Sequence, residues 1–268
     1  MSDLINTIFE KYPDQYLLAY IDVLGTNERI SKYNLSSDVA LTLHAIKKIF
    51  TKQQKTDNPN NQEKPEAFIF SDTLVLFIKV PENAINVYLF NFCNSILQTQ
   101  SILFDMEIFC RGAITHGDFF IDTEKNIFFG PAFSRAYELE QKCSKYPRII
   151  IDPSIFKKDT DSINSILQTL PTEVQKQQQL EIFNFWKTLI RENDVDGFAY
   201  IDYFIDDINI TTSTKQIRDK YLSLSPSNEI TELSPTQLSI REKYSWMIDK
   251  LQQRERRLQL NHINSQQS

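Results

Sequence analysis

Two aspartates that lie far apart in the sequence could together hold divalent cations. Asp22 follows the apolar run YLLAYI, and Asp72 lies in a short break between the apolar runs EAFIF and TLVLFIKV. Carboxylates at close quarters repel each other unless a cation lies between them. Mg²⁺ uses one or two protein carboxylates together with substrate phosphate oxygens, so the pair could hold two ions, Mg²⁺ or Mn²⁺, against a triphosphate. The plainer alternative is that Asp22 caps a turn and Asp72 occupies a hairpin loop.

Rigid elements are needed to bring the two aspartates together. Residues 66–80 predict two β-strands joined at Ser71-Asp72 by a tight turn, because two residues leave room for nothing longer. Residues 16–23 predict another strand, which we expect beside this hairpin in one sheet. Both hairpin strands are apolar at nearly every position, which predicts that both of their faces are buried.

The order of the predicted elements favours an α+β fold. Predicted strands cover residues 16–23, 66–80 as the hairpin, 107–115 and 148–152, and predicted helices cover 35–52, a segment beginning at 81, and 131–142. This is a ferredoxin-like β-α-β-β-α-β order with an extra hairpin at 117–129 and a further helix and strand. We expect the strands in one layer and the helices in another.

The character of the chain changes after Asp152. Gln-rich helical stretches follow, and Tyr244, Met247 and Leu251 form an apolar stripe at helical spacing. We therefore predict a first domain over residues 1–156. Residues 157–268 are predicted to form a mainly helical extension, packed on the first domain or on a second copy of it.

Composition narrows the classes of function. The net charge of −6 argues against a nucleic-acid partner, because no broad basic surface would attract phosphates. Three cysteines without a CxxC motif are typical of reduced thiols in a cytosolic protein. We expect no secretory signal and, since no apolar run reaches about 18 residues, no membrane span. The predicted location is the cytoplasm.

Five segments follow one another in an order that resembles the class III nucleotidyl cyclases: YIDVLG, FSD, RGAITHG, FGPAFSRAYELE and YPRIIID. The similarity covers roughly residues 16–156 and is greatest to the bacterial pyrimidine cyclases of Pycsar anti-phage systems. It implies a cyclase core, and metal-dependent conversion of UTP or CTP to a 3′,5′-cyclic monophosphate plus pyrophosphate. It also implies a homodimer with sites between the subunits, and a separate effector protein that responds to the cyclic nucleotide.

The resemblance assigns roles by position. Asp22 and Asp72 match the two metal-binding aspartates of the family, and the backbone carbonyls of Ile21 and Val23 are implied as further ligands. Arg148 falls where the family keeps a basic residue for the triphosphate, a task that suits the guanidinium fork. A surface arginine at a strand end is the alternative for Arg148.

The chain departs from the family on the helix after Gly130. The family's asparagine and arginine, one turn apart, are here Ser134 and Glu138. Arg135, about 100° round the helix from Ser134, is the possible substitute, so Ser134 and Arg135 are the candidate catalytic residues. The departure leaves open a weak or inactive nucleotide-binding module.

The predicted base pocket also departs from the purine cyclases. Phe68 occupies a position, four residues before Asp72, at which purine cyclases tend to carry lysine or glutamate. A bulky ring there favours a pyrimidine over ATP, although a core phenylalanine on a strand would look the same. Arg111 opens the RGAITH strand, where it could read the base or pair with an acidic neighbour.

Overall fold

The computed structural model describes residues 14–25, 44, 47, 65–80, 85–122, 125, 127–155, 164, 167–191, 194–204, 214–223 and 234–267. One seven-stranded sheet consists, in spatial order, of β2 (Glu66–Phe70), β3 (Thr73–Lys79), β1 (Gln15–Val23), β4 (Cys110–Asp118), β7 (Ile149–Ile151), β9 (Tyr200–Ile201) and β8 (Ile190–Arg191). A small second sheet pairs β5 (Phe120–Asp122) with β6 (Ile127–Phe129). The described helices are α4 (Ile85–Asp105), α5 (Pro131–Cys143), α7 (Glu173–Thr188), α8 (Thr214–Ser223) and α9 (Pro235–Gln267).

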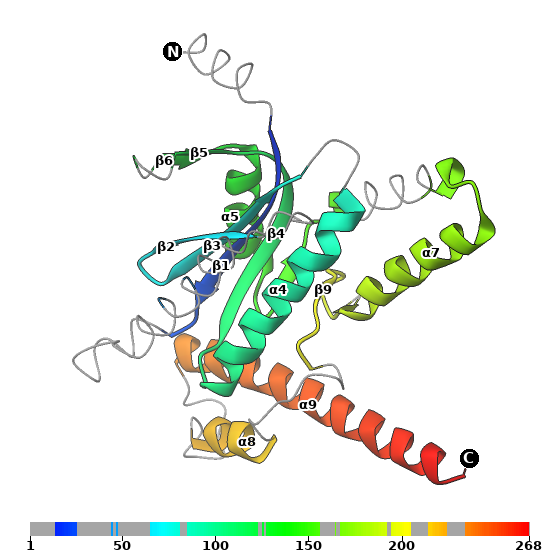
Figure 1. The fold of residues 1–268 in the computed structure, drawn as a ribbon. Helices are drawn as coiled ribbons and strands as arrows, with labels where there is room; N and C mark the ends of the chain where they lie inside the picture. The colour runs from blue at the N-terminus through cyan, green and yellow to red at the C-terminus, as the bar shows by residue number, and fades with distance from the viewer. Residues whose placement is uncertain are drawn as a thin grey trace.

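The large sheet is mostly antiparallel, which makes the protein an α+β protein (Figure 1). β4 and β7 run parallel, and the other described pairs run antiparallel. The predicted hairpin is confirmed, with Ser71 and Asp72 as its turn, and β1 lies beside it as predicted. The expectation that both hairpin strands are buried is wrong for β2, whose residues are half-buried or exposed. β2 forms the edge of the sheet, so it lacks a strand on one side.

Helices cover both faces of the sheet. Successive side chains of β1 point to opposite faces, and Ile21 packs in one buried cluster with Leu89 and Phe92 of α4. Leu18 packs in another cluster with Ala136 of α5. The expectation of one strand layer and one helix layer is therefore wrong, because α5 adds a third layer on the face opposite α4.

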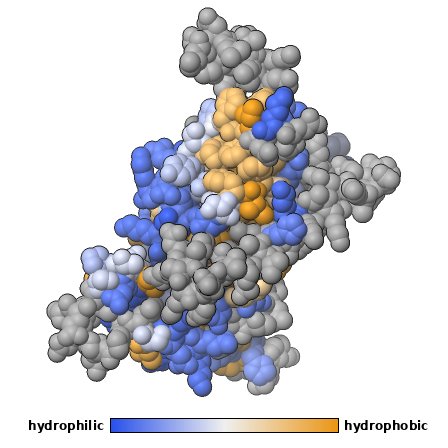
Figure 2. Space-filling model, turned by 90° about the vertical axis from the view of Figure 1, so that its left-hand side faces the viewer, coloured by the Kyte–Doolittle hydropathy of each residue, from blue (hydrophilic) through white to orange (hydrophobic). Residues whose placement is uncertain are grey.

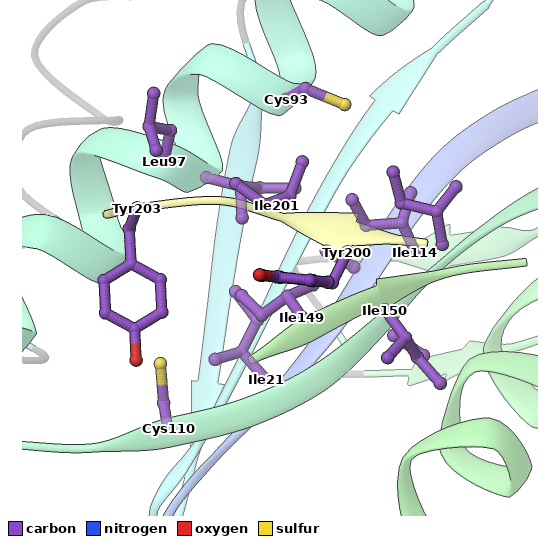
Figure 3. Packing of buried hydrophobic residues seen from close by; sticks show 14 of the residues in the cluster. Ile21, Cys93, Leu97, Cys110, Ile114, Ile149, Ile150, Tyr200, Ile201 and Tyr203 are labelled. Atoms are coloured by element: carbon purple, nitrogen blue, oxygen red, sulfur yellow. The ribbon is translucent and has the colours of Figure 1, made fainter. Parts of the chain in front are cut away.

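The larger buried cluster continues toward the C-terminal part of the sheet. Figure 3 shows Cys93 and Leu97 of α4 beside Ile201, with Ile149 and Tyr200 in the same cluster. β8 and β9 thus extend the sheet with strands that come from beyond position 156. The extension is not only helical, and the proposed division at residue 156 stays a prediction.

The long helix α9 packs on this core with the predicted apolar stripe. Met247 and Leu251 are buried in the larger cluster, and Tyr244 is half-buried against it. The predicted helix at 35–52 lies outside the described residues except for His44 and Lys47, which are both helical. Among the described helices, none combines the length and apolar character needed to cross a membrane.

Gly112 fixes the approach of β4 to β1. A Cβ at this position would lie 2.3 Å from the carbonyl oxygen of Tyr20, which is far inside van der Waals contact. Only glycine therefore allows the strands to pair here. The pairing places Arg111, the preceding residue in β4, opposite Asp22.

Candidate active site

The strand register brings Asp22 and Asp72 to the same end of the sheet. Asp22 pairs with Thr73, which directly follows Asp72 in the hairpin. The amide of Val23 donates to the carbonyl oxygen of Asp72 over 3.2 Å. Ser71 has a left-handed φ of 52°, which is unfavourable for a residue with a side chain. The hairpin tip is thus held in a strained turn against β1.

Burial and neighbouring charges together set the pKa of Asp22. Burial raises the pKa of Asp22 above its usual value, and the negative charge of Asp72 raises it further. Arg111 on β4 and Lys243 on α9 lower the same pKa, without reversing the rise. Arg111 and Lys243 thus offset the effect of Asp72 only in part, and a divalent cation would offset it further.

The raised pKa predicts how stability depends on pH. A carboxyl group whose native pKa is raised binds its proton more tightly in the folded state, so its ionisation destabilises the fold as pH rises through the native pKa. We expect Asp22→Asn to melt at about the same temperature as the wild type near pH 4 and higher at pH 7, without divalent ions. Thermal melts of both proteins across this range check the difference. A melting difference that does not change with pH would contradict it.

Arg111 lies between two acidic side chains. Its Nε is 2.7 Å from Oε1 of Glu140 and 3.6 Å from Oδ2 of Asp22. Nη1 also donates to the carbonyl of Ser144 over 3.4 Å. Of the two roles open to Arg111, base reading or pairing with an acidic neighbour, the structure shows the pairing.

Glu140 is a residue of this site to which sequence analysis gives no role. Its side chain is fully buried on α5, and burial raises its pKa despite the neighbouring Arg111. The sequence signal that could have placed Glu140 on the buried face was its spacing. Ala132, Ala136 and Glu140 recur every four residues on the face of α5 that meets the sheet.

The side chain of Arg148, the predicted triphosphate-binding residue, is buried and paired with carboxylates. Its side chain has no exposed surface, and its two terminal nitrogens pair with Asp194 and Asp196. The guanidinium also lies 5.3 Å from the ring centres of Tyr146 and Tyr200. The surface-arginine alternative is therefore wrong. The phosphate-binding role stays a prediction, and the burial and pairing of the guanidinium argue against it.

Asp194 links this buried cation to α9. Trp246 Nε1 and Lys250 Nζ donate to its two oxygens over 3.0 and 2.9 Å. These contacts lower the pKa of Asp194 although burial raises it. The cluster joins the segment before β9, the residue that precedes β7 and the helix α9, and so has a structural role.

A cavity of about 200 Å³ lies next to this cluster, between β8, β9 and α9. Its lining residues are Arg191, Asp194, Tyr200, Asp202, Phe204, Lys250, Gln253 and Arg257. Arg191 Nε is 2.7 Å from Asp202, and Lys250 is 2.9 Å from Asp194. Opposite charges in the lining thus pair with each other, and Asp22 and Asp72 are not part of it.

Ser134 and Arg135 lie on the exposed side of α5, away from the residues that pack on the sheet. Arg135 Nε donates to Oδ2 of Asp152 over 2.8 Å, an interaction that raises the pKa of Arg135. Within one copy, neither side chain lies on the buried face of α5, which packs on the sheet that carries the aspartates. Their catalytic role stays a prediction, and it would need a second copy.

Phe68 lies on the same face of the sheet as Asp22. It pairs with Val75, two residues along β3 from Thr73, the partner of Asp22, which corresponds to about 7 Å along the strand. Its half-buried ring is 4.7 Å from the ring of Phe128. A pocket wall and a packed aromatic residue are both compatible with this position.

Aromatic side chains continue from this point over the surface. We call Phe68, Phe70, Phe128, Phe133 and Tyr137 the aromatic patch. Tyr20 connects them from below, since its ring contacts three of them at 5.6–6.5 Å. Phe70 and Tyr137 are 38% and 47% exposed, and Figure 2 shows apolar residues gathered on this side of the molecule. Neighbouring apolar side chains that reach the surface in this way are a feature of interaction surfaces.

Ile21 and Val23 flank Asp22 in β1, and both side chains belong to the buried cluster on the other face. Their role as backbone ligands stays a prediction. No protein-family model matches the chain, and no curated protein matches it either.

Proposed function

We propose that this protein converts a pyrimidine nucleoside triphosphate, UTP or CTP, to its 3′,5′-cyclic monophosphate and pyrophosphate. The observation that carries the proposal is the strand register, which puts Asp22 beside Asp72 at one end of the sheet. The order of the five cyclase-like segments supports it. So does the antiparallel strand order β2-β3-β1-β4, which is the order of a ferredoxin-like core.

The donor set fits two divalent ions held together with a triphosphate. Asp22 and Asp72 would supply carboxylate oxygens. The backbone carbonyls of Ile21 and Val23 are hard oxygen donors of the kind that such ions bind. Burial raises the pKa of Asp22 most and the charge of Asp72 adds to the rise, and bound cations would offset both effects. When bound, Mg²⁺ or Mn²⁺ would stabilise the negative charge that develops on the phosphates.

The remaining residues position the nucleotide. The ribose 3′-oxygen attacks the α-phosphorus, the bond to the β-phosphate oxygen breaks, pyrophosphate leaves and the hydroxyl proton passes to water. With Arg148 buried, we assign positive charge at the phosphates to Lys243, whose charge already acts on Asp22. Phe68 would limit the pocket to a pyrimidine.

The aromatic patch supports a homodimer. A second copy on this surface would cover Phe70 and Tyr137 and bring Ser134 and Arg135 toward the partner's aspartates, as the cyclase resemblance implies. We expect Phe70→Lys together with Tyr137→Lys to convert a dimer to a monomer in size-exclusion chromatography with light scattering. Leu260→Lys, which changes an even more exposed apolar position on α9, is the control. An unchanged dimer in the double variant would contradict this interface.

The direct experiment is incubation of the purified protein with each of the four triphosphates and Mn²⁺, followed by mass spectrometry of the products. We expect cyclic UMP or cyclic CMP. Absence of a cyclic product from every triphosphate would contradict the enzymatic function. In the cell, we place the reaction in the cytoplasm, with the product as a second messenger of anti-phage defence that acts on a separate effector protein.

One observation favours a second candidate, a nucleotide-binding module without turnover. Arg135 is paired with Asp152, and Glu138 stands where the family has arginine. In the same experiment, this candidate predicts that a triphosphate binds, that no product forms, and that Asp22→Ala leaves binding unchanged.

A further inference from the structure

The guanidinium of Arg111 has two competing carboxylate partners. Glu140 holds it at 2.7 Å, whereas Asp22 lies at 3.6 Å. The other oxygen of Glu140 accepts a 2.7 Å hydrogen bond from Gln141. This bond orients the carboxylate so that the first oxygen faces Arg111.

The two carboxylates differ in their access to ions. The side chain of Glu140 is 0% exposed, while that of Asp22 is 24% exposed. A buried carboxylate without a positive partner is strongly unfavourable, so Glu140 retains the guanidinium. Asp22 is the carboxylate that solvent and a divalent ion can reach.

We propose that Glu140 is a positioning residue, which as the nearer partner of Arg111 limits how closely Arg111 pairs with Asp22 and so keeps Asp22 available to a divalent cation. The inference rests on the metal site of the proposed function, but not on catalysis. Without Glu140, the polar contacts left to Arg111 among the described residues are Asp22 and the carbonyl of Ser144. Arg111 would then pair closely with Asp22 and compete with the metal ion for it.

A calorimetric titration with MnCl₂ tests this, using the full-length wild type, Glu140→Gln, Arg111→Met and the double variant. Asp22→Asn identifies the heat that belongs to the Asp22 site. We expect Glu140→Gln to bind Mn²⁺ about tenfold more weakly, a change of about 1.4 kcal/mol. In the Arg111→Met background, the same substitution should change the affinity little, because the competing guanidinium is absent.

The double-mutant comparison separates this role from simple long-range charge. If Glu140→Gln weakens Mn²⁺ binding equally with and without Arg111, or not at all, the proposal is wrong. Glu138→Gln is the matched control, because it removes the same charge from an exposed position of α5. It should leave Mn²⁺ affinity nearly unchanged.

Two further outcomes keep the test decisive. The double variant replaces a buried ion pair by neutral groups of similar size, a change that proteins tolerate.

If Glu140→Gln alone does not fold, Glu140→Asp is the alternative variant, because it keeps the charge with a shorter reach. It should still weaken Mn²⁺ binding, and unchanged binding would overturn the proposal. If the variants change Mn²⁺ affinity as expected but the wild type makes no cyclic nucleotide, this inference is supported and the proposed function is wrong.

Discussion

Asp22→Asn and Asp72→Asn should each lower the rate of cyclic nucleotide formation at least about a thousandfold, which corresponds to about 4 kcal/mol of transition-state stabilisation. Each change removes one of the two carboxylates that the register brings to the same end of the sheet. Initial rates of cyclic UMP or cyclic CMP formation with saturating Mn²⁺ measure the loss.

A thousandfold lower rate of Asp22→Asn would not be due to loss of folding. Because the pKa of Asp22 is raised, its neutral replacement should increase the melting temperature at pH 7 while activity disappears. Asp219→Asn, an exposed position on α8, is the control and should retain full activity. If either site variant kept a tenth or more of the wild-type rate, the metal role of that aspartate would be wrong.

Arg148→Met should destabilise the fold by about 3–5 kcal/mol, because it leaves buried carboxylates without their positive partner. Asp194 is 2% exposed, and Asp196 is 27% exposed. For a protein of this size, the expected fall in melting temperature is about 10 °C. Differential scanning calorimetry at pH 7 provides the measurement.

The comparison variant for Arg148 is Arg218→Met, which removes the same charge from the exposed side of α8. It should change the melting temperature by less than about 2 °C. A stable Arg148→Met protein with a raised KM for the triphosphate would restore the phosphate-binding role that the burial of Arg148 argues against.

The central strands could be predicted because their signals are local. β1 and the hairpin are long apolar runs, and the two residues Ser71 and Asp72 permit only a tight turn. The start of α5 follows from Gly130 and Pro131, since proline favours the first turn of a helix. The meeting of Asp22 and Asp72 then followed from placing the two elements in one sheet.

Features that depend on distant partners could not be predicted. β8 and β9 have two residues each, too few to show a period of two, and they form because they extend the pairing from β7. Arg148 looks the same in the sequence whether it is exposed or buried. Its partners, Asp194 and Asp196, lie 46 and 48 positions further along.

The aspartate pair is tested most directly by the anomalous scattering of Mn²⁺ in crystals grown with MnCl₂ and a non-hydrolysable UTP analogue. We predict Mn²⁺ peaks that contact the carboxylates of both Asp22 and Asp72 and lie next to the α-phosphate. Mn²⁺ bound elsewhere, with none at this pair while the nucleotide is bound, would contradict the proposed site.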